Sequence, residues 1–186
     1  MEEKAALLVI DMQNDFLDPR GPFGDRDPEG LPPELTDMVC RVIRRARQRN
    51  MPVIHVYQEH RRQLVDFGRE LDRSRVHCVE GTRGARIVDE IEVLPEDFLV
   101  VKRRFSGFLH TDLELLLKGL GTDTLYFCGI AADGCVRATA ADAHQLNYRI
   151  RLIPEAVAGL TRESARAALE YLATLQPDVL IPLENF

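Results

Sequence analysis

The sequence contains no tryptophan and few lysines: its 186 residues have lysine at positions 4, 102 and 118 alone, and arginine supplies the other cationic side chains. It lacks an apolar run of about 18 residues and a charged-then-apolar leader, so we expect neither a membrane span nor a signal peptide. The net charge is −6 and no basic block stands out, which argues against a nucleic-acid partner. The arginines at positions 41–49 fall on a predicted amphipathic helix and are interpreted as its solvated face.

Cysteine is also sparse and shows no motif spacing. The four cysteines are Cys40, Cys78, Cys128 and Cys135. They form no CxxC pair and are too few for a small disulfide-rich secreted domain, so a reduced, cytoplasmic setting is expected. The length predicts a single domain over residues 1–186 that can bury a substantial core.

Short apolar runs alternate with segments in which apolar residues recur at helical spacing. The first run, Ala5–Ile10, is apolar throughout, as in a parallel strand covered on both faces. Further strands are predicted at 52–57, 97–101, 125–128, 148–153 and 178–181, and helices at 34–50, 85–94, 112–120, 136–145 and 161–175. This alternation predicts an α/β fold, with a parallel sheet between two layers of helices.

Three residues with reactive or charged side chains follow predicted strands: Asp11, Lys102 and, beyond a turn, Cys135. Right-handed crossovers place the carboxyl ends of parallel strands at one edge of the sheet, where open α/β proteins hold their sites. Cys135 also precedes a predicted helix, and the positive end of a helix dipole favours the reactive thiolate. The alternative is that Cys135 is a small buried apolar side chain, a common fate of free cysteine.

A long charged segment, Gln58–Gly84, shows no clear periodicity. Loops of this length in compact domains are often functional. His60, Asp66 and His77 are potential metal ligands, but their spacing matches no compact ligand motif, and arginines crowd the segment. We therefore predict a loop that covers the substrate or contacts another subunit, without a metal.

Four motifs spread over most of the chain resemble those of one family. They are DMQNDF at 11–16, HCVEGT at 77–82, KRRFSGF at 102–108 followed by TDL at 111–113, and GIAADGCV at 129–136 followed by Thr139, Ala140, Asp142 and Ala143. Together they resemble the isochorismatase-like cysteine hydrolases, which include nicotinamidases, N-carbamoylsarcosine amidases and related hydrolases of small amides.

The resemblance implies a catalytic triad of Asp11, Lys102 and Cys135. It also implies a cis peptide bond between Ile130 and Ala131, and an oxyanion hole formed by the backbone N–H groups of Ala131 and Cys135. The implied fold is a three-layer α/β/α sandwich with a six-stranded parallel sheet of order 3-2-1-4-5-6, in a homo-oligomer (dimer or tetramer). No cofactor is predicted.

Two departures within the family indicate the reaction. Isochorismatases proper lack the nucleophilic cysteine, so Cys135 points to the branch that cleaves amides. Nicotinamidases are characterised by an Asp-x-His motif and further histidines, which together hold a metal. At the corresponding place this chain has Gln58-Glu59-His60, and Asp66 lies near the position of the next nicotinamidase histidine. We therefore predict a metal-free cysteine amidase that acts on a small amide or an N-carbamoyl or ureido compound and releases ammonia through a thioester. A nicotinamidase-type, metal-assisted amidase is the alternative.

The candidates for binding the small-molecule substrate come from the loops after the strands. Aromatic side chains are expected to form walls of the pocket, polar residues after the second strand to reach the site, and Arg103 or Arg104 to pair with a carboxylate. The full set is Phe16, Gln58, His60, Arg104, Phe105 and Phe108. Two other classes of protein remain open: a thiol redox or sensor protein that uses Cys135 with Cys128 as the resolving cysteine, and a catalytically silent family member that binds a ligand.

Overall fold

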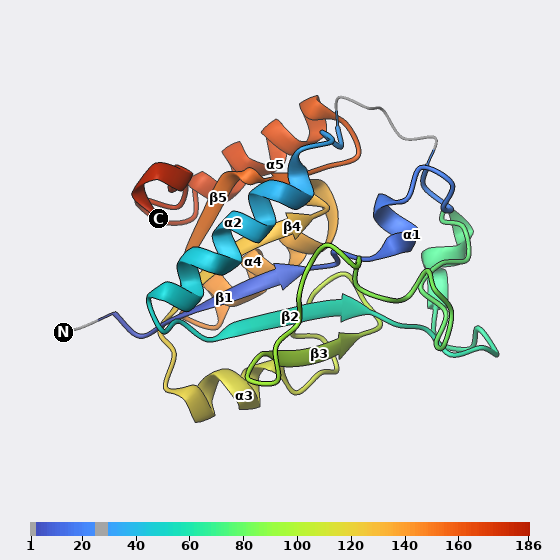
Figure 1. Ribbon diagram of the computed structural model, residues 1–186, viewed down its shortest axis with the longest axis horizontal. Helices are drawn as coiled ribbons and strands as arrows, with labels where there is room; N and C mark the ends of the chain where they lie inside the picture. Colours follow the sequence, from blue (N-terminus) through green and yellow to red (C-terminus); the bar gives the residue numbers. More distant parts are fainter. Residues whose placement is uncertain (1–2, 25–29) are drawn as a thin grey trace.

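Five parallel strands form the central sheet, in the order β3-β2-β1-β4-β5 (Figure 1). The computed structural model describes residues 3–24 and 30–186. The strands are β1 (Ala5–Ile10), β2 (Val53–Gln58), β3 (Phe98–Lys102), β4 (Thr124–Ile130) and β5 (Arg149–Ala158). β1 lies at the centre and pairs in parallel with both β2 and β4. The predicted parallel α/β architecture is confirmed, with this order over five strands.

Helices cover both faces of the sheet and complete a three-layer α/β fold. Helix α2 (Leu35–Gln48) packs on one face, and α3 (Leu113–Leu120), α4 (Arg137–Gln145) and α5 (Arg162–Ala173) pack on the other (Figure 1). The short helical segments are α1 (Asn14–Leu17), η1 (Gly68–Asp72), η2 (Ala132–Val136) and η3 (Leu183–Asn185). Among the residues that the structure describes, no helix is both long and apolar enough to cross a membrane.

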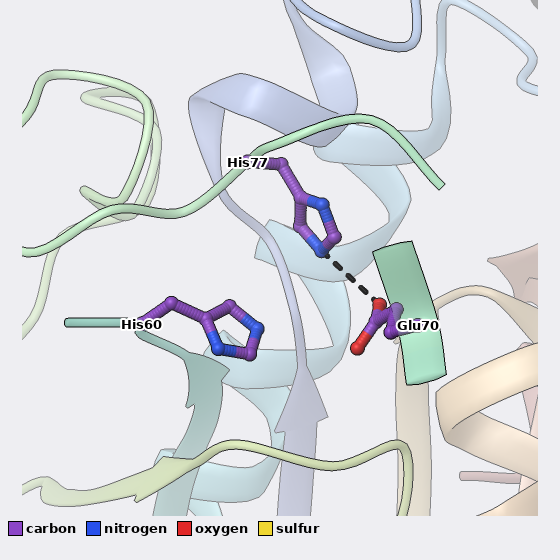
Figure 2. Close-up of side chains that lie close together, drawn as sticks. All are labelled: His60, Glu70 and His77. Carbon is purple, nitrogen blue, oxygen red and sulfur yellow. Dashed lines mark ion pairs between the residues drawn. The ribbon is translucent and has the colours of Figure 1, made fainter. Parts of the chain in front are cut away.

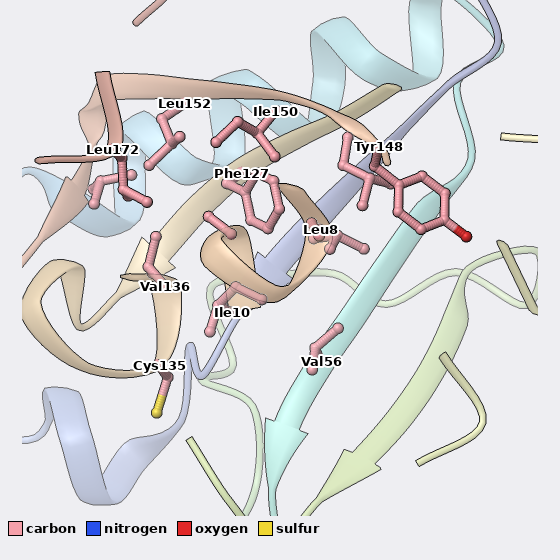
Figure 3. Packing of buried hydrophobic residues seen from close by; sticks show 14 of the residues in the cluster. Leu8, Ile10, Val56, Phe127, Cys135, Val136, Tyr148, Ile150, Leu152 and Leu172 are labelled. Atoms are coloured by element: carbon pink, nitrogen blue, oxygen red, sulfur yellow. The ribbon is translucent and has the colours of Figure 1, made fainter. Parts of the chain in front are cut away.

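The side chains of β1 alternate between the two cores. Leu7 and Val9 pack toward α2, whereas Leu8 and Ile10 join the core formed with α3, α4 and α5. Because both faces are covered, every position can be apolar, which explains why the sequence of β1 shows no polar alternation. Cys135 lies at the margin of the second core, beyond Ile10 and Val136 (Figure 3).

The predicted sixth strand at 178–181 does not form; this segment contributes a single parallel bridge, between Leu180 and Leu152. The Leu152 N–H donates to the Val179 carbonyl, and the Ile181 N–H donates to Leu152. The next donor along β5 is missing because residue 154 is proline, which has no N–H. The prediction of six strands was therefore wrong: proline ends the ladder after one rung.

The predicted helix at 85–94 is also absent. This segment runs beside the stretch after β1: Ile87 forms an antiparallel bridge with Gln13, and the Val88 N–H donates to the Met12 carbonyl. The segment contains several β-branched residues, which suit an extended backbone. Hydrogen bonds to a distant part of the chain thus outweighed a local helical pattern.

Candidate active site

Asp11, Lys102 and Cys135 meet at the carboxyl edge of the sheet: Asp11 follows β1, Lys102 is the last residue of β3, and Cys135 lies in η2 after β4. Lys102 Nζ lies 2.8 Å from Asp11 Oδ2 and donates a hydrogen bond to Cys135 Sγ at 3.2 Å. Their exposed fractions are 1%, 0% and 7% for Asp11, Lys102 and Cys135. The structure therefore brings together the three residues that the strand ends predicted, in a site almost closed to water.

The pKa values of these three buried side chains depend on one another. Burial raises the pKa of the Asp11 carboxyl, although the charge of Lys102 and a hydrogen bond from Cys135 oppose the rise. Burial and the Asp11 carboxylate also raise the pKa of the Cys135 thiol, against the charge of Lys102. Burial would lower the pKa of Lys102, but interaction with Asp11 and Cys135 raises it. The pair Asp11–Cys135 thus keeps a proton opposite a charged Lys102, and the resting thiolate expected from the helix dipole is not favoured.

The backbone around Cys135 is shaped by a turn between β4 and α4. The peptide bond between Ile130 and Ala131 is cis. The Ala131 carbonyl accepts hydrogen bonds from Gly134 and Val136, which closes the turn that carries Cys135. Ala131 and Cys135 both line the adjacent cavity, as an oxyanion hole in this turn requires.

Thr139, on α4, ties this turn to the loop that follows Lys102. Its hydroxyl donates to the Cys135 carbonyl at 2.7 Å and accepts from the Gly107 N–H at 2.9 Å. The Lys102 ammonium also donates to the Arg104 carbonyl at 3.1 Å in that loop. The positions of the thiol and the ammonium are therefore linked through short hydrogen bonds.

A cavity of about 830 Å³ opens beside Asp11 and Cys135. Much of its wall is aromatic or aliphatic: Phe16, Phe23, Phe67, Phe105, Leu109 and Leu160. Polar and charged side chains are placed among them: Gln58, Arg69, Glu70, Arg73, His77 and Arg104. An apolar cavity with a few polar groups placed in its wall is the usual form of a small-molecule site.

Four of the predicted substrate-binding residues line this cavity, namely Phe16, Gln58, Arg104 and Phe105, and two do not. Phe108 instead packs in the core against Tyr148, with ring centroids 6.0 Å apart, because the turn at Gly107 directs its ring toward α3 and α4. His60 is fully buried behind the wall and stacks on Phe67 at 3.6 Å. The expectation that Phe108 and His60 contact the substrate is corrected accordingly.

His60, Glu70 and His77 form a compact cluster next to the cavity, and Figure 2 shows the three side chains directed toward one another. Their ligand atoms all lie within 4.8 Å of one another. Glu70 was not among the sequence candidates, because nothing in the charged loop distinguishes it from its acidic neighbours. Asp66, which was a candidate, lies behind His60 and is 3.3 Å from its Nδ1 atom.

The donor types of this cluster suit a divalent metal, but the Gln58 side chain between them does not. The side-chain nitrogen of Gln58 lies 2.7 Å from His60 Nε2 and donates to both oxygens of Glu70, at 3.2 and 3.3 Å. An amide nitrogen has no lone pair available for a metal, and here its N–H groups use the lone pairs of two ligands. The residues present therefore do not fit a bound metal, and no catalytic step is assigned to one.

Cys128 and Cys135 belong to opposite faces of the sheet. Cys128 is packed in the core under α2, whereas Cys135 borders the core on the other face. All four cysteines are free. Because the sheet separates the two sulfur atoms, Cys128 is poorly placed as a resolving cysteine for the redox alternative.

The fold and the site define a parallel α/β protein with a cysteine, a lysine and an aspartate in contact at the carboxyl edge of its sheet. The model of the isochorismatase domain family matches residues 5–180, so the chain belongs to this family of hydrolases.

Individual relatives agree with this assignment. The chain is 37% identical over 169 residues to a protein of Arabidopsis thaliana named a probable inactive nicotinamidase. The aligned region covers 85% of this chain and 82% of the relative. An isochorismatase family protein from Desulfovibrio vulgaris has a TM-score of 0.89 and 29% identity, over 98% of this chain and 96% of that one. N-carbamoylsarcosine amidase from Thermoplasma acidophilum has a TM-score of 0.82 and 29% identity, over 98% of each chain.

Proposed function

We propose that this protein is a cysteine amidohydrolase that cleaves a small amide or an N-carbamoyl or ureido compound and releases ammonia. The observation that carries the proposal is the contact of Lys102 Nζ with both Asp11 Oδ2, at 2.8 Å, and Cys135 Sγ, at 3.2 Å, beside the cavity. The structural likeness to N-carbamoylsarcosine amidase supports the choice of substrate class.

The first step transfers a proton inside the triad. Asp11 takes the proton of the Cys135 thiol, which leaves one thiolate and a neutral carboxyl opposite the Lys102 ammonium. The total charge of the buried site does not change in this step. Loss of the same proton to water would instead leave two anions facing one cation, which burial penalises. An internal base is therefore needed, and Asp11 is the carboxylate in place.

The thiolate then attacks the carbonyl carbon of the amide or carbamoyl group. The oxyanion that develops is held by the backbone N–H groups of Ala131 and Cys135, a contribution of roughly 3 kcal/mol per donor. Asp11 returns its proton to the leaving nitrogen, the C–N bond breaks, and ammonia departs from a thioester. Water, deprotonated by Asp11, hydrolyses the thioester and restores the Cys135 thiol. An amide gives a carboxylic acid in this way, whereas a carbamoyl compound forms the corresponding thiocarbamate, whose hydrolysis gives a carbamic acid that loses carbon dioxide and leaves an amine.

The walls of the cavity suit a small substrate with an apolar part and a polar end. Phe16 and Phe105 offer apolar surface, and Arg104 offers a guanidinium for a substrate carboxylate. A homo-oligomer (dimer or tetramer) and a cytoplasmic location stay predictions from the sequence.

Ammonia release is the measurement that tests the proposal. Purified protein is incubated with primary amides, N-carbamoyl amino acids, ureido acids and biuret, and ammonia is followed with time. We expect release from at least one compound, its loss in Cys135→Ala, and its retention in the matched control Cys128→Ala, whose thiol lies in the other core. Release at the native rate by Cys135→Ala would contradict the mechanism.

A catalytically silent ligand-binding protein is the second candidate. The name of the Arabidopsis relative, a probable inactive nicotinamidase, favours it. The contact of Asp11, Lys102 and Cys135 favours an active enzyme instead. A compound from the same panel that raises the melting temperature without any release of ammonia would support the silent protein.

A further inference from the structure

We propose that the Gln58 amide occupies the place of a cation in the His60–Glu70–His77 cluster, and that Lys102 keeps the amide in this orientation. The cluster is then a latent metal site, meaning a set of metal ligands that would bind a cation if the amide were removed. This inference concerns cation binding and goes beyond the proposed amidase reaction. It rests on the hydrogen bonds of Gln58, which join the cluster to the triad.

The two histidines are oriented as metal ligands are. His60 Nδ1 lies 3.3 Å from Asp66 Oδ1, and His77 Nδ1 lies 2.7 Å from the Arg75 carbonyl. In each ring Nδ1 thus donates its proton to an acceptor outside the cluster, and Nε2 faces the cluster. An acceptor that binds the outer nitrogen is the usual support of a metal-bound histidine. With Glu70 as the third ligand and the cavity alongside, the set resembles an open three-ligand zinc site.

The Gln58 amide fills this site from the inside. Its Nε2 atom lies 2.7 Å from His60 Nε2 and within 3.3 Å of both Glu70 oxygens. Its two N–H groups therefore satisfy the His60 imidazole and the Glu70 carboxylate, while His77 Nε2 lies 3.3 Å from Glu70 Oε1. A cation can therefore enter the cluster only if these hydrogen bonds break or if the Gln58 amide rotates and directs its oxygen toward the cluster.

Lys102 prevents the amide from turning. Gln58 Oε1 lies 3.4 Å from the Lys102 ammonium. The Gln13 side chain also fixes the backbone of Gln58: it accepts from the Gln58 N–H at 2.9 Å and donates to the Gln58 carbonyl at 2.7 Å. A turned amide would place N–H groups against an ammonium and a carbonyl oxygen against the Glu70 carboxylate. Both contacts are repulsive, so Gln58 cannot easily present its oxygen to a metal.

The test is the affinity for Co²⁺ of the full-length protein after treatment with a chelator, measured by calorimetry and by the visible absorption of bound cobalt. We expect Gln58→Ala to bind Co²⁺ about 10- to 100-fold more tightly than the wild type, because the hydrogen bonds of the amide no longer compete. Gln58→Glu should bind at least as tightly as Gln58→Ala, because it adds a carboxylate ligand. The double variant Gln58→Ala/His60→Ala should lose the gain.

The outcomes decide the matter without any measurement of turnover, so they are independent of the proposed function. Equal affinity of wild type and Gln58→Ala, or tighter binding by the wild type, would overturn the inference, because Gln58 would then be a bystander or a ligand. Circular dichroism and the melting temperature check that each variant is folded. If Gln58→Ala fails to fold, the nearly isosteric Gln58→Glu decides, and a folded Gln58→Glu without tighter binding overturns the inference equally.

Discussion

Lys102 Nζ lies 2.8 Å from Asp11 Oδ2, and the side chain of each residue is at most 1% exposed. Burying two charges is costly, so such a pair is weak evidence for stability in itself. The geometry instead makes the pair interdependent: each charge is tolerated because the other is present.

Lys102→Met should abolish ammonia release and destabilise the protein by about 3–5 kcal/mol, because a buried carboxylate is left without its counter-charge. Denaturation by urea and the ammonia assay give the two readouts. The double variant Lys102→Met/Asp11→Asn should recover much of the stability and none of the activity, since no unpaired charge is then buried. Ammonia release by Lys102→Met at the native rate would contradict the assigned role of the lysine.

Thr139→Val should lower the free energy of unfolding by about 1–3 kcal/mol, because the Gly107 N–H loses its buried acceptor. It should also slow ammonia release, because the turn of Cys135 is no longer tied to the loop after Lys102. Thr139→Ser keeps the hydroxyl and is the control for both measurements. If Ser is impaired and Val behaves as the wild type, the methyl packing rather than the hydroxyl matters at this position.

Phe105→Ala should raise KM about 5- to 30-fold with little change in kcat, because it removes apolar contact with the substrate away from the reacting atoms. Phe105 lines the cavity and is 50% exposed, so the substitution should leave stability nearly unchanged. Leu115→Ala on α3 removes an exposed apolar side chain outside the cavity lining and should leave KM unchanged. A fall in kcat with constant KM would place Phe105 in another role.

Stability should fall as the pH rises above about 9. Burial raises the pKa of Cys78, Cys128 and Cys135 far above the ordinary thiol value of 9.0. In the unfolded chain these thiols lose protons above that pH, while the folded protein retains them, so the unfolded state binds fewer protons and is favoured by alkali. Urea unfolding between pH 7 and 10.5 measures the slope. Cys128→Ala should flatten it more than Cys40→Ser, since Cys40 is less buried.

The sequence allowed the meeting of Asp11, Lys102 and Cys135 at one edge of the sheet to be predicted, because strand ends leave a local trace; their role as a triad was implied by the family resemblance. An apolar run that stops at Asp11, another that stops at Lys102, and a turn that leads to Cys135 are each visible within a few residues. The parallel topology then brings such ends to the same edge without further information. The order of the five strands that form came instead from the family resemblance, and the structure confirms it.

Features that depend on distant contacts were not predictable in the same way. Glu70 enters the cluster through a loop whose path is set by pairings such as the bridge between His60 and Val79. The segment 85–94 has a helical pattern but takes its hydrogen bonds from the stretch after β1. The sixth strand depended on Pro154, whose effect on the edge of β5 appears only when the neighbouring segment is placed beside it.

The position of the Gln58 amide also has a consequence for how such proteins diverge. Glutamine and glutamate codons differ by a single nucleotide. The nearly isosteric change Gln58→Glu would replace the amide N–H groups between His60 and Glu70 by a carboxylate that can bind a metal. The rest of the ligand set, with its supporting acceptors, is already assembled. Metal-free and metal-dependent descendants of this scaffold would thus be neighbours in sequence space, separated by one codon change rather than by the construction of a new site.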